Sequence, residues 1–342
     1  MNGTSRKNLI SLLRVALGVG LLIYLFFRMR DEFDGLGEVL LTSLSNWPWW
    51  AFSLGLTFLG LLVGALRWYY ILRAARLPLP WPKVFSIFFI GQFFNSFMLG
   101  ACGGDLARAL YVAREWPGKK TEAAMTALID RAVGLLVLVV FGSAVALYRF
   151  HLFFDNIGNR WMGIVMVSFL LGAAALILLL LRKNLFDHWS LFRRWEERTK
   201  TGAMFRKVYD AFFIYHRNIP ALIVSVILSF LNLALLTLAC MCIGISLGVD
   251  LRMRDYFTIF PVITVISSLP LTPGGLGVRE GMFIELLDTL GVGAVQAMPL
   301  SLMTYLGGLL WSLFGGLIFL GYSSSVGRTP KHEIEALTKS AK

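Results

Sequence analysis

The sequence predicts an all-α polytopic membrane protein with about six transmembrane helices and two oppositely oriented re-entrant helical hairpins that form an inverted repeat. Three observations lead to this fold. The 342 residues are 57% hydrophobic and only 15% charged, with a mean hydropathy of +0.71, a composition typical of a bilayer protein. Several apolar stretches exceed the roughly 18 residues that a spanning helix needs. Two glycine-rich stretches followed by charged residues interrupt this apolar pattern.

The spanning segments can be taken in chain order. Residues 15–27 follow a basic start but precede no small-x-small cleavage site, so we interpret them as a retained anchor rather than a signal peptide. The other predicted spanning helices cover residues 49–66, 125–148, 161–181, 221–247 and 298–320. No soluble domain fits between them. The whole chain, 1–342, is therefore predicted to form one integral membrane domain.

The charges predict which loops face the cytoplasm, because lysine and arginine accumulate on that side of a membrane. Loop 28–47 carries four acids and is predicted to lie outside, whereas the basic loop 67–83 is predicted to lie inside. Segment 182–218 alternates aromatic and basic residues and is predicted to be a cytoplasmic amphipathic segment on the inner leaflet. The tail 323–342 is also basic. Both termini are thus predicted to be cytoplasmic, in a bacterial inner membrane.

The net charge of +12 also fits this membrane reading. Basic residues flank membrane segments and no nucleic-acid-binding motif is present, so we expect no nucleic-acid partner. The three cysteines and four histidines lack ligand spacing, which predicts no metal site. No phosphate-cradling Walker loop occurs, so no ATPase site and no cofactor are expected.

Two stretches, 84–116 and 256–290, cannot each cross the membrane once if the charge assignments hold. A single crossing by 84–116 or by 256–290 would place a later basic segment on the wrong side. Each stretch is therefore predicted to re-enter and return, with a glycine-rich tip inside the bilayer. An apolar arm of 14 or 15 residues, at ~1.5 Å per residue, reaches past the middle of a ~30 Å core. We expect the two tips to meet near the midplane.

The two hairpins also match each other in sequence. A single shift of 171 residues superposes their motifs, namely Gly103, Gly104 and Arg108 on Gly274, Gly275 and Arg279. The flanking helices follow in the same order in both halves. The sequence therefore predicts half-repeats over about 9–148 and 161–320 with opposite orientations, as in many secondary transporters.

Each predicted hairpin tip begins a half-helix, where free N–H groups and the helix dipole favour an anion. Arg108 and Arg279 stand in the first turns and are predicted to bind phosphate. Asp105 and Glu280 lie near the same helix starts, where they could cap the helix, pair with the arginines or carry a proton. The predicted substrate-binding residues are Gly103, Gly104, Asp105, Arg108, Thr272, Pro273, Gly274, Gly275, Gly277, Arg279 and Glu280.

Helix 125–148 adds two further charges, Asp130 and Arg131, about two turns from its predicted cytoplasmic end. One interpretation is a structural pair with a snorkelling arginine. The other is a polar gate or proton relay. Both remain open from the sequence.

Three motifs carry a resemblance to a known family: Gly103-Gly104-Asp105-Leu106-Ala107-Arg108, Asp130-Arg131, and Leu271-Thr272-Pro273-Gly274-Gly275-Leu276-Gly277-Val278-Arg279-Glu280. In these residues the chain resembles the lysylphosphatidylglycerol synthase transmembrane-region family, over nearly its whole length. The resemblance implies translocation between leaflets of aminoacylated phosphatidylglycerol, hopanoid-type lipids or polyprenyl-linked sugars. The chain looks like the integral module without a synthase domain, so we expect no enzymatic activity.

The predicted function is translocation of a phosphate-containing phospholipid or a polyprenyl-linked lipid between the leaflets of the inner membrane. Two alternatives remain open. One is a membrane-embedded glycosyltransferase, because such enzymes often have acidic residues in the first outer loop and this chain has the acidic stretch 31–34 there. The other is a scaffold for envelope assembly. The sequence does not indicate the oligomeric state or the headgroup.

Overall fold

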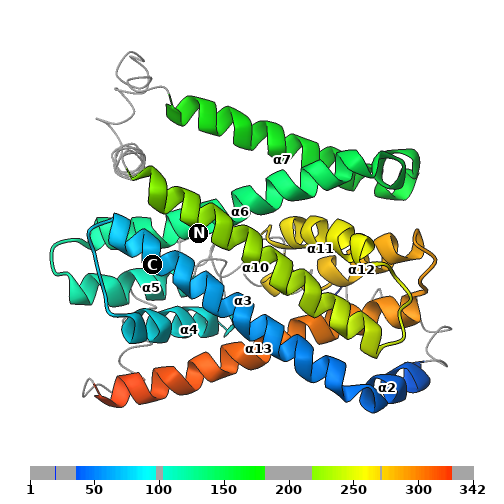
Figure 1. Ribbon diagram of the computed structural model, residues 1–342, viewed down its shortest axis with the longest axis horizontal. Coiled ribbons are helices and arrows are strands. Elements are labelled where there is room, and N and C mark those ends of the chain that lie inside the picture. Colours follow the sequence, from blue (N-terminus) through cyan, green and yellow to red (C-terminus); the bar gives the residue numbers. More distant parts are fainter. Residues whose placement is uncertain (1–19, 21–35, 98–102, 182–217, 270–271, 326–342) are drawn as a thin grey trace, which may run out of the picture.

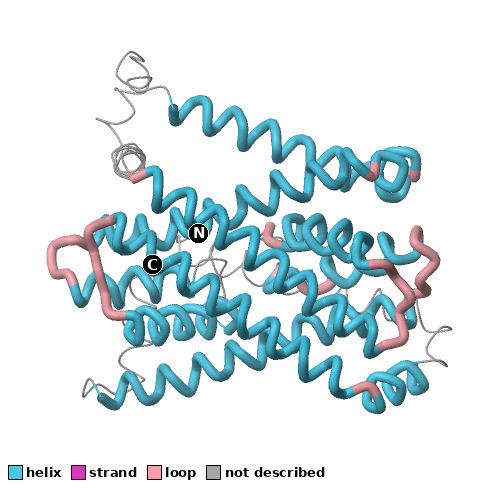
Figure 2. The backbone as a smooth tube through the Cα atoms, in the orientation of Figure 1, coloured by secondary structure: helices cyan, strands magenta, loops and turns pink. Residues whose placement is uncertain are grey.

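The structure is a computed structural model that describes residue 20 and residues 36–97, 103–181, 218–269 and 272–325. All regular elements in these ranges are helices (Figure 2). Five of the helices are long and apolar enough to cross a membrane. The predicted all-α polytopic membrane fold is therefore confirmed. Several predictions fall wholly or mostly outside the described residues, namely the span 15–27, the acidic stretch 31–34, the amphipathic segment 182–218 and the tail 323–342.

Each of the five membrane-length helices begins before a predicted span and covers it, except that α10 ends one residue before the predicted end at 247. They are α3 (Trp47–Ala74), α6 (Lys120–Tyr148), α7 (Ile157–Leu181), α10 (Ile219–Ser246) and α13 (Ala294–Ser325). The largest difference is at α3, which continues for two turns past the predicted end at residue 66. Arg67 and Arg73 were predicted in loop 67–83 but lie in this helix. An apolar stretch stops at a charged residue, but the helix itself can continue when the charged side chain is paired with another group.

A second difference concerns the predicted outer loop 28–47, which contains helix α2 (Leu36–Ser45). α3 starts directly after it, with Pro48 in its first turn, where the missing N–H of proline leaves no helix bond unmade. A short π-helix, η2 (His151–Asp155), connects α6 to α7. α2 and η2 are short and partly polar, so a search for apolar stretches of membrane-spanning length does not detect them.

Both predicted hairpin stretches have the order helix, break, helix. In the first half, α4 (Trp81–Phe97) is followed by α5 (Gly103–Glu115). In the second half, α11 (Met253–Ser267) is followed by a 3-10 turn, η3 (Pro273–Gly275), and by α12 (Val278–Asp288). The breaks coincide with the glycine-rich motifs. How deeply the two pairs enter a bilayer stays a prediction.

Figure 1 shows how these elements are arranged around two long neighbouring helices, α3 and α10. The α4–α5 pair lies at one end of the long helices and the α11–α12 pair at the other. α4 packs against α13, and α11 packs against α6, so the first arm of each pair contacts the last helix of the other half. This reciprocal packing is what an inverted repeat would produce, although the repeat itself stays a prediction. α7 lies at one edge, beside α6 (Figure 1).

Glycines allow these helices to cross at short distances. A Cβ atom on Gly315 of α13 would lie 2.1 Å from the carbonyl oxygen of Phe89 in α4. Small residues at helix crossings are the usual means of close packing in membranes, where apolar side chains gain little by leaving lipid. This contact holds α4 firmly against the opposite half and thereby positions the start of α5.

The opposed orientation of the two pairs can be tested by labelling. We expect cysteines at Lys120, which begins α6, and at Gly293, which precedes α13, to react with an impermeant maleimide from opposite sides of the membrane. Both residues are exposed, and the lysines beside position 120 predict a cytoplasmic location. The three native cysteines would first be replaced by serine. Labelling of both positions from the same side would contradict the opposed hairpins.

Candidate functional site

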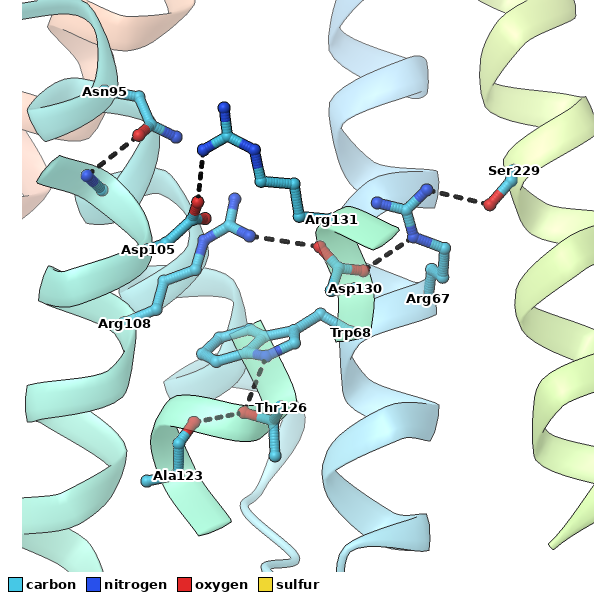
Figure 3. Close-up of polar contacts among 11 residues, drawn as sticks. Arg67, Trp68, Asn95, Asp105, Arg108, Ala123, Thr126, Asp130, Arg131 and Ser229 are labelled. Atoms are coloured by element: carbon cyan, nitrogen blue, oxygen red, sulfur yellow. Dashed lines mark hydrogen bonds and ion pairs between the residues drawn. The ribbon is translucent and has the colours of Figure 1, made fainter. Parts of the chain in front are cut away.

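Asp130 of α6 is the centre of a buried ionic cluster (Figure 3). Its Oδ1 atom accepts a hydrogen bond of 2.7 Å from Nε of Arg67, and its Oδ2 atom accepts one of 3.2 Å from Nη1 of Arg108. The side chains are 4% exposed for Asp130, 13% for Arg67 and 4% for Arg108. Two arginines from α3 and α5 therefore share one carboxylate away from water.

The sequence positions Arg67 in this cluster through contacts with two other helices. Its Nη1 atom donates to Oγ of Ser229 in α10 at 2.9 Å. A Cβ atom on Gly134 would lie 2.9 Å from the same Nη1 atom, so glycine leaves the space that the guanidinium occupies. Ser229 belongs to the second half of the chain. The cluster thus joins α3, α5 and α6 of the first half to α10 of the second.

Arg108 is held by aromatic rings as well as by Asp130. Its guanidinium carbon lies 4.1 Å from the centroid of Phe88 and 5.5 Å from that of Trp68, distances suited to cation–π contact. A Cβ atom on Gly91 would lie 2.7 Å from Nε of Arg108, so this glycine leaves space for the side chain. That Nε atom is buried and has no hydrogen-bond partner. Arg108 therefore keeps an unused donor.

The charges of this cluster do not balance. Arg67 and Arg108 contribute two positive charges and Asp130 one negative charge. An uncompensated charge among helices of membrane length costs several kcal/mol by order of magnitude. Such an arrangement persists when an anion supplies the missing charge, and the spare N–H of Arg108 can donate to that anion.

The remaining predicted residues of the first motif form a neighbouring pair (Figure 3). Asp105, in the first turn of α5, accepts a hydrogen bond of 2.7 Å from Nη1 of Arg131. Asp130 and Arg131 therefore have different partners, and the structural pair, one of the two interpretations that the sequence left open, does not describe their contacts. Successive residues on a helix point about 100° apart, so Asp130 and Arg131 reach different partners.

The start of α5 is capped from α4. The N–H of Gly104 donates to Oδ1 of Asn95 at 2.9 Å, so Asn95 takes the capping role that the sequence left open for Asp105. A Cβ atom on Gly104 would lie 2.0 Å from the carbonyl oxygen of Gly91. Only glycine permits this approach, which explains the glycine of the first motif.

The second motif forms its own cluster around Glu280, whose side chain is fully buried. One carboxylate oxygen accepts the N–H of Gly277 at 2.6 Å, which caps α12. The other oxygen accepts hydrogen bonds from Ser301 of α13, at 3.2 Å, and from Nη2 of Arg279. Glu280 is thus both a cap and an ion-pair partner, two of the three roles that its position allowed.

Arg279 is fixed on three sides. Besides Glu280, its Nε atom donates to Oγ of Ser301 at 3.1 Å. Its guanidinium carbon lies 4.4 Å from the centroid of the Tyr305 ring. In contrast to the first cluster, one arginine meets one carboxylate here, and the charges balance.

The turn before α12 requires glycine at three positions. Gly274, Gly275 and Gly277 have φ values of 64°, 71° and 81°, in the region that side chains rarely adopt. Thr272, just before the turn, is 5% exposed, and its Oγ1 atom is buried without a hydrogen-bond partner. Pro273 begins the turn η3. The second motif therefore combines a shaped backbone with an unused hydroxyl.

The predicted site residues gather into two clusters rather than one. Within the described ranges the two arginines have separate protein partners, and the meeting of the two tips near the midplane stays a prediction. Arg108 is held by Asp130, and Arg279 by Glu280 and Ser301. The hydrogen-bond partner of Arg108 comes from α6, and those of Arg279 come from α12 and α13.

The packing of α6 against α11 relates Asp130 to the end of α11 along the helix axes. α6 and α11 run antiparallel and meet at Gly142 and Pro261, with the ion pair of Arg149 and Asp255 at 2.9 Å nearer one end. Counting from this crossing at 1.5 Å per residue, Asp130 and the end of α11 at Ser267 differ by about 9 Å in height.

Several residues that contact the predicted ones were not predicted, among them Arg67, Ser229, Ser301 and Tyr305. Ser229, Ser301 and Tyr305 lie within apolar helices, where a single polar residue is no specific signal. Arg67 did have a specific signal in the sequence, because it directly follows an apolar run and precedes Trp68. Nowhere in the described ranges do three or more His, Cys, Asp or Glu residues gather as they would around a metal ion.

Comparison with known proteins yields one family and several relatives. The sequence model described as "Lysylphosphatidylglycerol synthase TM region" matches residues 11–315. A UPF0104 membrane protein of Methanothermobacter thermautotrophicus is 26% identical over 92% of this chain and 93% of its own length. A UPF0104 membrane protein of Pyrococcus horikoshii is 22% identical over 77% of this chain and 83% of its own length. No solved structure matches the chain.

Proposed function

The chain belongs to the lysylphosphatidylglycerol synthase transmembrane-region family of multi-pass membrane proteins, and from this membership and the buried clusters we propose that it moves a phosphate-containing lipid between leaflets. The lipid is a membrane phospholipid or a polyprenyl-linked lipid. The protein acts as a transporter and not as an enzyme. It uses no ATP, because the sequence has no phosphate-cradling Walker loop.

One observation carries the proposal, the sharing of Asp130 by Arg67 and Arg108. The shared carboxylate leaves one positive charge in a nearly water-free place, and the spare Nε–H of Arg108 is directed at no protein acceptor. A lipid phosphate supplies one negative charge and several acceptor oxygens. Its arrival balances the cluster, and its departure restores the imbalance.

The same imbalance suggests how binding remains reversible. A charge that the protein already stabilises in part, through Asp130 and the rings of Trp68 and Phe88, binds phosphate less tightly than a bare arginine would. Release to either leaflet then needs no large energy input. Transport on this basis is passive or follows an ion or proton gradient.

The location follows from the charge pattern and also belongs to the proposal. We place the protein in a cell membrane, the inner membrane if the source is bacterial, with both termini in the cytoplasm. The relatives named above come from archaea, and a single cytoplasmic membrane fits both cases.

Reconstitution tests the function directly. The purified protein is placed in phosphatidylcholine vesicles that contain a trace of fluorescent phosphatidylglycerol, and dithionite is added to quench the outer leaflet. We expect the inner-leaflet probe to become accessible in protein-containing vesicles without ATP. Fluorescent glucosylceramide, which has no phosphate, serves as the control lipid and should stay protected. Equal movement of both lipids, or of neither, would contradict phosphate-dependent translocation.

A further inference from the structure

The Asp130 cluster, formed by Asp130, Arg67 and Arg108, adjoins apolar residues on α3. Ile71 and Ala74 lie four and seven residues after Arg67, at positions that share one side of an α-helix. Their exposed fractions are 1% and 7%. The helix face that carries Arg67 therefore becomes apolar and buried toward the end of α3.

The facing side of α10 changes in the same direction. α10 packs along α3 and runs antiparallel to it (Figure 1). Toward the start of α10, the face that carries Ser229 continues with Ser225 and then with Leu222. Ser225 is fully buried, and its hydroxyl donates to the carbonyl of Ala221 at 2.7 Å. This face thus passes from a hydroxyl that meets Arg67, through a hydroxyl that its own helix uses, to a leucine.

Helix α6 supplies a third side. Ile129, next to Asp130, is 5% exposed and forms one hydrophobic cluster with Ile71 and Ala74. Leu222 of α10 packs against this cluster. Its buried residues belong to neither of the two larger hydrophobic cores. We call Ile71, Ala74, Ile129 and Leu222 the apolar seal.

The apolar seal lies between the Asp130 cluster and one end of the three helices. Along α3, Ile71 and Ala74 are about 6 Å and about 10 Å beyond Arg67, at ~1.5 Å per residue. α3 ends at Ala74, and Leu222 stands in the first turn of α10. The basic residues near this end predict that it faces the cytoplasm. A group that approaches Arg67 between α3, α6 and α10 from this end meets the seal first.

Arg67 is the least buried member of the Asp130 cluster. Its side chain is 13% exposed, against 4% for Arg108 and 4% for Asp130. Its Nε and Nη1 atoms donate to Asp130 and Ser229, and a guanidinium has further N–H groups for a third partner. Of the two arginines, Arg67 is therefore the one that an approaching anion reaches more easily.

A small apolar contact in this place suits a gate. Touching apolar side chains exclude water and charged groups, which is how hydrophobic constrictions close channels. The seal has fewer buried residues than either of the two larger cores. The free energy of an apolar contact grows with the area that it buries, so the three helices separate more readily at the seal than at the cores.

We infer that the apolar seal is the gate through which a lipid headgroup reaches the Asp130 cluster from the leaflet at this end of the protein. The inference rests on the proposed function and extends it to the route of entry. The gate is closed in the structure. Its opening brings the headgroup phosphate first to Arg67 and then to Arg108.

Cysteine labelling tests whether the seal closes this route. Ser229→Cys is introduced after the three native cysteines are replaced by serine, and inside-out membrane vesicles present the predicted cytoplasmic side. The probe is a negatively charged, membrane-impermeant methanethiosulfonate. We expect slow modification with the intact seal and about tenfold faster modification after Ile71→Ala, because the substitution removes apolar area from the contact. Leu222→Ala, at a partly buried position, is less disruptive to the fold and should act in the same direction.

Ile263→Ala is the matched control. Ile263 of α11 is as buried as Ile71, at 1% exposure, but it belongs to a larger core. Its replacement should lower the unfolding temperature in detergent as Ile71→Ala does, and it should leave the labelling of Ser229→Cys unchanged. The comparison separates local opening of the seal from general loosening of the fold.

Lipid movement tests whether the gate serves transport. In the dithionite assay with fluorescent phosphatidylglycerol, Ile71→Ala should speed the lipid and Ile263→Ala should not. Ala74→Leu enlarges the seal and should slow the lipid about tenfold, by the same dependence on apolar area. Thermal unfolding checks that each variant is folded.

Three results would overturn the inference and leave the proposed function standing. The first is equal labelling of Ser229→Cys with the intact seal, with Ile71→Ala and with Leu222→Ala. The second is equal acceleration of labelling by Ile71→Ala and Ile263→Ala. The third is unchanged lipid movement in both Ile71→Ala and Ala74→Leu. If the wild-type protein moves no lipid, the proposed function is rejected and the inference falls with it, whatever the labelling shows.

Discussion

Replacement of Asp130 by asparagine should abolish transport and destabilise the protein by about 3–5 kcal/mol, the usual cost of removing one partner from a buried ion pair. The substitution keeps the shape of the side chain but leaves Arg67 and Arg108 without their shared carboxylate. Thermal unfolding in detergent and the dithionite assay measure the two effects. Glu122→Gln, two turns earlier on α6 and without a hydrogen bond or ion pair within the described ranges, is the control and should change neither.

A second substitution distinguishes charge balance from shape. Arg67→Gln combined with Asp130→Asn restores the original net charge of the cluster, because one arginine and one carboxylate are removed together. We expect the double variant to recover part of the lost stability. A double variant as unstable as Asp130→Asn alone would show that the pair of Arg67 and Asp130 does not carry the effect.

Replacement of Arg108 by lysine should lower the transport rate about 10- to 100-fold while leaving the fold intact, since hydrogen bonds to charged groups contribute about 1.5–3 kcal/mol. Lysine keeps the charge but loses the planar guanidinium that stacks on Phe88 and the N–H that has no protein partner. The same assay with fluorescent phosphatidylglycerol measures the rate, and thermal unfolding checks the fold.

Arg73→Lys is the matched control for this substitution. Arg73 lies six residues after Arg67 on α3 and is exposed, and its guanidinium lies over the ring of Tyr69 without a side-chain hydrogen bond or ion pair to the described residues. Its replacement should leave transport unchanged. Wild-type transport by Arg108→Lys would show that the position supplies charge alone, and the assignment of Arg108 as the phosphate ligand would then be withdrawn.

The two clusters differ in a way that bears on the transport cycle. The first has two arginines for one carboxylate, whereas Arg279 and Glu280 form a balanced pair. Similar motifs at two helix starts have thus acquired different charge states. On the proposed function, the unbalanced charge favours the first cluster over the second as the place where a phosphate binds.

The sequence by itself determined the membrane class, the five described spans and the two broken helix pairs. These features are local, because hydropathy adds up along consecutive residues. A turn that needs positive φ also requires glycine, so it is recognisable from glycines close together in the sequence. The positions of Gly274, Gly275 and Gly277 are an example. Helix ends were less well predicted. The apolar run ends before Arg67, but α3 continues to Ala74 because Arg67 is paired with Asp130 inside the protein.

Only the tertiary structure decided which charges meet. Whether Asp130 faces Arg131, Arg67 or Arg108 depends on the rotation and crossing of α3, α5 and α6, and no local pattern specifies these. The same holds for Ser229 and Ser301, which are ordinary helix residues until another helix brings an arginine to them. Partner choice in a bilayer is a property of packing, since each buried charge pairs with whichever group the neighbouring helices place within hydrogen-bond distance.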